Sequence, residues 1–313
     1  MPFVTAQTLP ASAPSTPVSG IPRTLLLCLK ESRPAVLAAF QLRFLAGVAL
    51  VPASTTVLGV RPALQATLCF VAWFCAVFYT YLYNGYMDYR EDRVNESTRP
   101  IASLKLPRST ALTVARCAAL AALICAAGAG LGALLLCTAL LLLGYGYSSP
   151  RTAWKNRTPA VMGVVFVSGL LTYSAGPVAL GSSPASPALL LTAFAMSLWM
   201  ALVGAVAKDF SDIEGDIASG RRTWAITLGE RRARLLVAVG ACAVGGGYTA
   251  GAAAWAPELL PVASVVLAGA VVLATVTLTG QGATRRSRRR LPYRCFMGTQ
   301  HCAHLALLGQ AVI

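Results

Sequence analysis

Long apolar stretches separated by short polar segments dominate the chain beyond residue 30. A helix needs about 20 predominantly apolar residues to cross the hydrocarbon core of a membrane. Nine stretches approach that length, at about 35–57, 66–87, 110–127, 129–147, 158–176, 187–207, 235–255, 260–280 and 295–313. The pattern therefore predicts an all-α integral membrane protein with about nine transmembrane helices.

The third and fourth stretches are separated by no charge, only by the glycines at 128, 130 and 132, so we expect a glycine-rich turn there. The first 20 residues are rich in Pro, Ser, Thr and Ala and lack the basic and apolar regions of a signal peptide. We expect residues 1–30 to form a disordered tail and residues 31–313 to form one membrane domain.

The composition excludes an ordinary soluble protein. Of the 313 residues, 56% are hydrophobic and only 12% are charged, whereas about 25% are charged in an average soluble domain. The nine cysteines lie mostly inside apolar stretches and show no CxxC spacing. We interpret them as small buried hydrophobic residues rather than as disulfides or zinc ligands.

The basic residues separate by loop. All of the 26 Lys and Arg residues except Arg43, Arg61 and Arg116 lie in the N-terminal segment or in the loops after the second, fourth, sixth and eighth stretches. The positive-inside rule then places the N-terminus and those loops in the cytoplasm and the C-terminus outside. The arginine-rich run at 285–294 occupies one short loop, so we interpret it as a topology anchor near anionic lipid and expect no nucleic-acid partner.

The acidic residues form two clusters, although the formal net charge is +15. Eight of the 11 acids lie in NGYMDYREDRVNE and KDFSDIEGD, each at the cytoplasmic end of an even-numbered stretch. If the helices continue past the membrane boundary, the spacings i, i+4, i+8 and i, i+3, i+7 put each set on one helix face. Oxygen ligands in two facing stripes suit Mg²⁺, and a pair of clusters favours this over solvated loop charges paired with arginines. The candidate ligands are Asn84, Asp88, Asp92, Asp209, Asp212 and Asp216.

The two clusters resemble the motifs of the UbiA-type intramembrane prenyltransferases. The family's first motif is approximately NDxxDxxxD, often followed by NxxxRP, and its second is DxxDxxxD followed by a Gly and a Leu-Gly. Here the corresponding segments read NGYMDYREDRVNESTRP and DFSDIEGDIASGRRTWAITLG. The resemblance implies that the six candidate ligands hold Mg²⁺ and the substrate diphosphate. One departure is plain, because Gly85 stands in the place of the first motif's leading Asp.

The same resemblance implies a function and an architecture. We expect the helices to surround a central apolar cavity lined by aromatic side chains, first among them the cluster that precedes Asp88 in the second stretch. Asp88, Asp92, Asp212 and Asp216 at its cytoplasmic mouth would promote ionisation of an allylic diphosphate. The leading hypothesis is a magnesium-dependent transfer of an isoprenyl group to an aromatic or other lipophilic acceptor. The alternative is a terpene cyclase without an acceptor. A transporter is less favoured, because the acids lie at one membrane face rather than at the midplane. The sequence does not specify chain length, acceptor or oligomeric state.

Several basic residues are candidates for contact with the diphosphate. In YSSPRTAWK, Arg151 follows Tyr147 at the spacing of the family's YxxxK pattern, and Lys155 lies four residues further on. A cation there would bind the departing diphosphate; the alternative is a topology anchor. Arg99, Lys208 and Arg222 are further candidates for phosphate contact.

Polar residues inside the apolar stretches have two interpretations. Arg43 is costly at membrane depth and should face the protein interior. There it would either recognise an acceptor carboxylate or pair structurally with an acid or a backbone carbonyl. His301 and His304 lie three residues apart, and we interpret them as packing or hydrogen-bonding residues rather than as catalytic ones.

Overall fold

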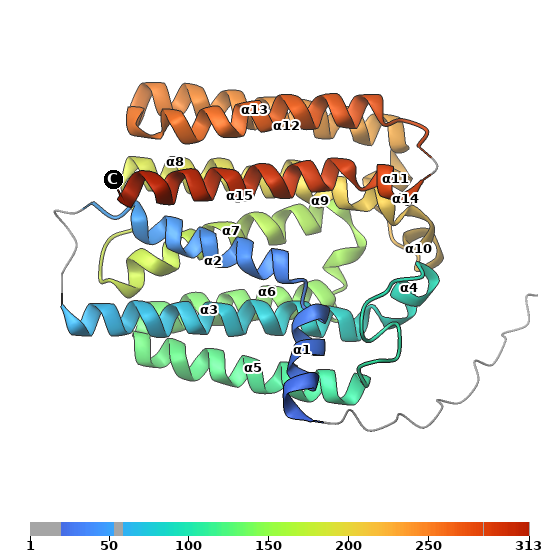
Figure 1. Cartoon of the computed structure of the whole chain (residues 1–313), viewed down its shortest axis with the longest axis horizontal. Helices are drawn as coiled ribbons and strands as arrows, with labels where there is room; N and C mark the ends of the chain where they lie inside the picture. Colours follow the sequence, from blue (N-terminus) through green and yellow to red (C-terminus); the bar gives the residue numbers. More distant parts are fainter. Residues whose placement is uncertain (1–19, 53–58, 284, 313) are drawn as a thin grey trace, which may run out of the picture.

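The computed structural model describes residues 20–52, 59–283 and 285–312. In this part of the chain the regular elements are helices, and one isolated bridge joins Arg157 and Arg222. The long helices lie side by side and run along the longest axis of the molecule (Figure 1). They are α2 (Pro34–Ala49), α3 (Val60–Met87), α5 (Arg108–Ala129), α6 (Leu131–Ser148), α7 (Thr158–Ala179), α8 (Pro187–Leu198), α12 (Glu230–Trp255), α13 (Leu260–Thr279) and α15 (Leu291–Val312).

The all-α prediction is confirmed. Seven helical segments of the described chain are long and apolar enough to cross a membrane. Two of them are composite: Pro187–Ser211 continues α8 through the short helical turns that follow it, and Pro257–Thr279 is α13 with the turn before it. The predicted count of nine is not established, because α2 has only 16 residues and α15, which contains Arg294, Gln300 and two histidines, is not among the seven. The predicted glycine turn is present, since Gly130 separates α5 from α6 with a φ of 123°.

The shorter elements connect the long helices. Figure 1 shows α4, α10, α11 and α14 together at one end of the bundle, which we call the polar end. Short elements are α1 (Ile21–Glu31), α4 (Tyr89–Val94), η2 (Trp154–Asn156), η3 (Trp199–Gly204), α9 (Ala205–Ala207), η4 (Lys208–Ser211), α10 (Ile213–Ala218), α11 (Trp224–Thr227), η5 (Pro257–Leu259) and α14 (Arg286–Arg289).

Helix α1 corrects part of the predicted N-terminal tail. Residues 21–30 were expected to be disordered, but they form most of this amphipathic helix, which lies across the bundle near the end of α3 (Figure 1). Its apolar positions Ile21, Leu25 and Leu26 are exposed, whereas Cys28 and Glu31 are buried. The helix is therefore anchored at its C-terminal end. The rest of the predicted tail, residues 1–19, lies outside the described residues.

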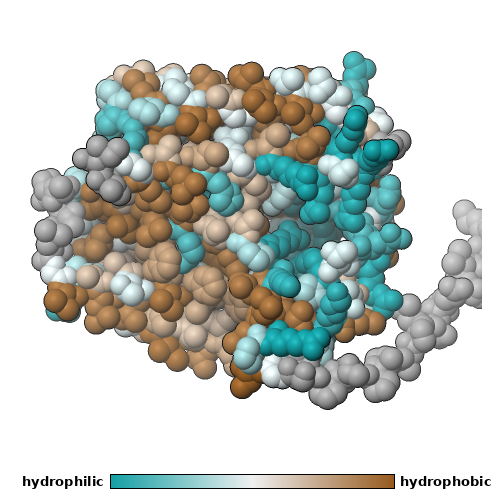
Figure 2. Space-filling model, in the orientation of Figure 1, coloured by the Kyte–Doolittle hydropathy of each residue, from teal (hydrophilic) through white to brown (hydrophobic). Residues whose placement is uncertain are grey.

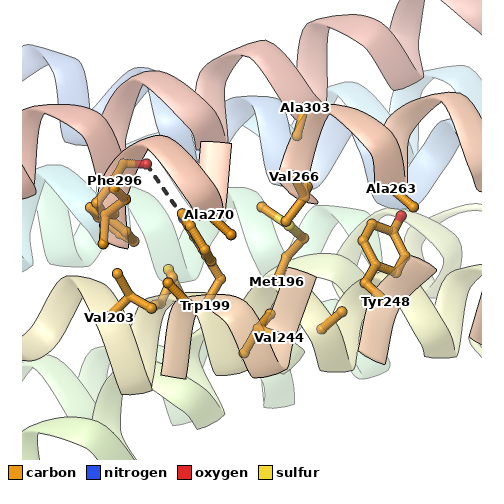
Figure 3. Close-up of a cluster of buried hydrophobic side chains, with 14 of the residues drawn as sticks. Met196, Trp199, Val203, Val244, Tyr248, Ala263, Val266, Ala270, Phe296 and Ala303 are labelled. Atoms are coloured by element: carbon orange, nitrogen blue, oxygen red, sulfur yellow. Dashed lines mark hydrogen bonds between the residues drawn. The ribbon is translucent and has the colours of Figure 1, made fainter. Parts of the chain in front are cut away.

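Three buried clusters of apolar side chains hold the described helices together. Figure 3 shows the larger cluster, where Met196 and Trp199 meet Tyr248, Val266 and other side chains from α12, α13 and α15. The Trp199 indole N–H donates to the backbone oxygen of Phe296, with 3.4 Å between the two atoms. A second cluster joins α2, α3, α5, α6 and the end of α7, and a third joins α1, α3 and α5. A buried indole N–H group needs a hydrogen-bond partner. The bond from Trp199 to Phe296 supplies that partner and connects η3 to α15.

Helices α2 and α7 approach each other closely because small residues lie between them. A Cβ atom on Gly47 would lie 2.2 Å from the backbone oxygen of Tyr173. We predict that Gly47→Ala lowers the melting temperature of the purified protein by several degrees, because overpacking costs about 2 kcal/mol. Gly246→Ala in α12 is the matched control, since its Cβ would meet no atom within 4 Å. Equal melting temperatures for the two variants, measured by differential scanning fluorimetry, would contradict the close contact.

Candidate active site

The first acidic cluster keeps nearly helical geometry at the end of α3. The Asp88 N–H donates to the backbone oxygen of Asn84 and the Asp92 N–H to that of Asp88, each at 2.8 Å. The chain passes from α3 through Asp88 into α4. The expected i, i+4, i+8 register of these residues is therefore retained at the polar end.

The second acidic cluster departs from the expected continuous helix. A 3-10 turn, η4, contains Asp209, and the backbone leaves helical geometry at Asp212, where φ is −123° and ψ is 12°. A new short helix, α10, then carries Asp216. Because the register changes at this break, Asp209 and Asp216 are buried whereas the side chain of Asp212 is 37% exposed.

One guanidinium joins the two clusters. Arg221 Nη2 lies 3.2 Å from Asp88 Oδ1 and also contacts Glu91, and its Nη1 lies 3.2 Å from Asp216 Oδ1. Sequence reasoning did not assign Arg221 or Glu91 a role. The available signal was position, because Glu91 lies inside the first cluster and Arg221 follows Asp216 by five residues. The shared cation brings two motifs far apart in sequence to one place.

Lys155 adds a second cation on the same carboxylates. Its ammonium group forms an ion pair with Asp88 and lies 3.4 Å from Glu91 Oε1. Burial alone would raise the pKa of Asp88, but Lys155 and Arg221 lower that pKa below its ordinary value. Burial and the neighbouring Asp88 carboxylate raise the pKa of Glu91. The site thus keeps Asp88 negatively charged beside two positive groups.

A separate cluster centres on Arg99. Its Nη1 lies 2.6 Å from Asp92 Oδ2, and its Nη2 lies 2.7 Å from Oε1 of Glu31, a residue at the end of α1. Burial raises the pKa of Glu31, and Arg99 opposes that rise. Sequence reasoning did not connect Glu31 with this site, and no local motif marks it. Arg99, predicted as a phosphate contact, is engaged here by two carboxylates.

The remaining carboxylates each have one cationic partner. Lys208 Nζ lies 2.5 Å from Asp209 Oδ1. Arg286 of α14 lies 3.0 Å from Asp212 Oδ1, and its Nη1 also donates to the backbone oxygen of Asn95 at 2.5 Å. The loop that carries the arginine-rich run therefore contacts the second acidic cluster through Arg286.

The donor set fits a magnesium ion that arrives with phosphate oxygens. Among the described residues no three His, Cys, Asp or Glu side chains converge as a ready-made metal site. Asp216 Oδ2 is nevertheless buried and accepts no hydrogen bond within the described part of the chain. Burial raises the pKa of Asp216 to about 6, against the effect of Lys208 and Arg221. Since Mg²⁺ is usually held by one or two carboxylates together with substrate phosphates, Asp216 and Asp88 are suitable ligands.

The other predicted site residues are divided between the site and its surroundings. The Asn84 amide N–H donates to Ser148 Oγ at 3.3 Å, so Asn84 contacts the end of α6. Tyr147 is half-buried near the end of α6. Arg151 is exposed in the following turn. Of the two cations in YSSPRTAWK, Lys155 thus reaches the carboxylates, and no described residue forms an ion pair with Arg151.

Arg43 lies inside the bundle, away from the acidic clusters. It is 2% exposed, and its Nη2 donates to Gln300 Oε1 at 2.5 Å. Its guanidinium also lies 4.8 Å from the centre of the Phe40 ring. Nearby, His304 Nε2 and the Tyr173 hydroxyl share a hydrogen bond of 2.5 Å. Arg43 Nε and Nη1 form no well-aligned hydrogen bond with a described residue, and the Tyr173 hydroxyl lies beside the guanidinium.

The aromatic residues before Asp88 occupy different faces of α3. Tyr79 and Tyr83 stack with ring centres 5.6 Å apart, and Tyr83 also stacks on Tyr145 of α6, which is 42% exposed. Tyr81 instead lies 5.8 Å from the Arg33 guanidinium at the start of α2. The helical period separates these residues, so only part of the expected aromatic lining faces the interior between α2 and α3.

Hydrophilic side chains cover the polar end, whereas apolar side chains cover much of the remaining surface in this view (Figure 2). A cavity of about 360 Å³ is lined by Arg157, Pro159, Arg222, Trp224 and Thr227. The motif carboxylates are not part of its wall. The central apolar cavity therefore stays a prediction, and the candidate site is defined by its ion pairs.

Comparisons with known proteins agree with these motifs. Residues 43–297 match the UbiA prenyltransferase family. Digeranylgeranylglyceryl phosphate synthase from Thermococcus kodakarensis is 28% identical over 244 residues, which cover 73% of this chain and 82% of that protein. The synthase of the same name from Pyrococcus abyssi is 32% identical over 159 residues, but the match spans only 50% of this chain and about half, 54%, of that protein.

Solved structures show the same fold. A UbiA homologue from Archaeoglobus fulgidus bound to GPP and Mg²⁺ superposes with a TM-score of 0.68, covering 92% of this chain and 100% of that one at 15% identity. An apo UbiA homologue from Aeropyrum pernix gives a TM-score of 0.63 at 17% identity, covering 87% of this chain and 96% of that one. Because the family match extends over most of its length, the protein belongs to the UbiA prenyltransferase family.

Proposed function

We propose that this protein is a magnesium-dependent intramembrane prenyltransferase that moves an isoprenyl group from an allylic diphosphate to a lipophilic acceptor. The observation that carries the proposal is the position of Arg221, which pairs with Asp88 of the first motif and Asp216 of the second. Family membership supports the reaction class. The positive-inside pattern supports a cytoplasmic position for the polar end.

The chemistry follows from the charges at this end. The allylic C–O bond breaks, the diphosphate leaves with the electron pair, and the acceptor's nucleophile bonds to the resulting allylic cation and loses a proton. Bound Mg²⁺, held by Asp88, Asp216 and the other predicted ligands, would supply positive charge to the departing oxygens. Lys155 and Arg221 are already at these carboxylates, so they are placed to bind the diphosphate and stabilise its growing charge.

The names of the relatives support a proposal for the class of acceptor. The archaeal relatives are named digeranylgeranylglyceryl phosphate synthases, which favours a long prenyl diphosphate and a lipophilic acceptor that carries a glyceryl phosphate. An aromatic acceptor remains the alternative within the same reaction. Arg43 is our candidate for contact with the acceptor's anionic group, because two of its buried nitrogens form no well-aligned hydrogen bond with a described residue.

Metal dependence tests the proposal. In a purified preparation supplied with geranylgeranyl diphosphate and an archaeal-type glycerophosphate lipid acceptor, EDTA should abolish diphosphate release and Mg²⁺ should restore it. Asp88→Asn and Asp216→Asn should each lower turnover on the order of a hundredfold. Full turnover in EDTA would refute the metal assignment. Hydrocarbon products formed without any acceptor would instead identify a terpene cyclase.

Neutralising the loop cations distinguishes their roles. We predict that Lys155→Met and Arg221→Met lower diphosphate release by a similar factor, on the order of a hundredfold, for every acceptor, because ionisation precedes capture. Arg151→Met measured in parallel reports whether the exposed cation of the YxxxK-like pattern contributes as well. Arg231→Met, an exposed arginine at the start of α12, should leave release unchanged. Normal release in both the Lys155 and Arg221 variants would remove this pair from the reaction.

Replacing a residue that binds only the acceptor should lower turnover by a factor that depends on the acceptor. Arg43→Ala should lower turnover with an anionic acceptor more than with a neutral one, because the lost interaction belongs to the acceptor alone. The measurement is kcat/KM for the two acceptors, with diphosphate release in parallel. Equal losses of kcat/KM for the two acceptors would contradict this role and indicate that Arg43 is structural, beside Gln300.

A further inference from the structure

Gly85 leaves a space that another residue fills. A Cβ atom at this position would lie 2.3 Å from Glu31 Oε1, 3.0 Å from Glu31 Cδ and 2.8 Å from Arg99 Nη2. Any side chain at position 85 would therefore overlap the ion pair formed by these two residues. The first motif thus has a glycine where a carboxylate from α1 enters.

The Glu31 carboxylate is held firmly in that space. The residue is fully buried, its Oε2 accepts a hydrogen bond from the Ile101 N–H at 2.9 Å, and its Oε1 pairs with Arg99 Nη2 at 2.7 Å. Arg99 Nη2 also donates to the Glu31 backbone oxygen at 3.0 Å. A buried carboxylate with a bound guanidinium and a backbone donor fixes the end of α1 against the segment that carries Arg99.

The contact continues to a predicted metal ligand. Arg99 uses its other terminal nitrogen, Nη1, to bind Asp92 Oδ2 at 2.6 Å. The guanidinium is planar and rigid, so holding it at one nitrogen also sets the direction of the other. The position of the Asp92 carboxylate consequently depends on Glu31, since Arg99 binds both acids.

We propose that Glu31 is a positioning residue for the active site: from α1, and through Arg99, it orients Asp92, and Gly85 provides the space that it needs. This inference rests on the proposed magnesium site, in which Asp92 is a ligand. It assigns α1 a role in the site. One of the two carboxylates that pair with Arg99 comes from α1 and occupies the space beside Gly85.

A carboxylate swap tests the proposal. Glu31→Gln and Glu31→Ala should raise the Mg²⁺ concentration needed for half-maximal turnover by about tenfold, as is typical when a residue behind a metal ligand is lost. Gly85→Asp alone should also impair the enzyme, because the new side chain overlaps Glu31. The double variant Glu31→Ala/Gly85→Asp should recover most of the loss, since it places a carboxylate beside Arg99 from α3. Glu31→Ala/Gly85→Ala, which adds volume without charge, should not recover.

A second readout does not depend on turnover. Mg²⁺ with inorganic diphosphate should raise the melting temperature of the wild type and of Glu31→Ala/Gly85→Asp more than that of Glu31→Ala/Gly85→Ala. Glu258→Gln, an exposed acid in η5, is the matched control and should behave as the wild type. Melting temperatures without ligand identify any variant that fails to fold, and Glu31→Gln, which keeps the side-chain volume, then carries the test.

The outcomes are distinct. Equal behaviour of the two double variants, or a wild-type magnesium dependence in Glu31→Gln, would overturn the positioning role. Absence of any magnesium effect in the wild type would instead overturn the proposed function.

Discussion

The polar end depends on one constraint: buried carboxylates from two distant segments must share cations or repel one another. Arg221 meets this constraint, because its planar guanidinium offers several donors and binds Asp88, Glu91 and Asp216 together. A lysine at position 221 would offer a single charged nitrogen and could not join both motifs in the same way. The long helices bring their ends near one another, but the shared guanidinium decides how the acidic segments meet.

Arg99 repeats this arrangement at the first motif. It joins Asp92 to Glu31 and so connects the site to α1, a helix whose apolar positions Ile21 and Leu25 are exposed. The polar end is thus built from two arginine-centred clusters, one between the motifs and one between the first motif and α1. In both, the charged groups lie at the border of an apolar bundle, where unpaired charge is costly.

Much of the scaffold could be predicted from the sequence, because helix formation in apolar stretches and turns at glycines are local effects. The register of Asn84, Asp88 and Asp92 followed from helical spacing. The break at Asp212 did not, since a 3-10 turn replaces the regular helix there and no residue in the cluster signals it.

Contacts between residues far apart in sequence could not be predicted either. Spacing alone could not tell that Lys155 rather than Arg151 is buried with the carboxylates, because the turn that follows α6 decides this. Nothing near Glu31 in sequence indicates a partner at Arg99, and α1 itself was assigned to a tail. The aromatic residues before Asp88 looked like one cluster in sequence, yet Tyr81 and Tyr83 lie on different faces of α3. Such features arise from tertiary packing, which local sequence patterns do not reveal.

The central claim is that carboxylates of both motifs act together on one metal–diphosphate complex. The most direct measurement is electron paramagnetic resonance of Mn²⁺, used in place of Mg²⁺ and titrated into purified protein with inorganic diphosphate. The expected result is Mn²⁺ binding that requires diphosphate and is lost in both Asp88→Asn and Asp216→Asn. Unchanged binding in either variant would contradict the claim, because the two motifs would then not share the ion.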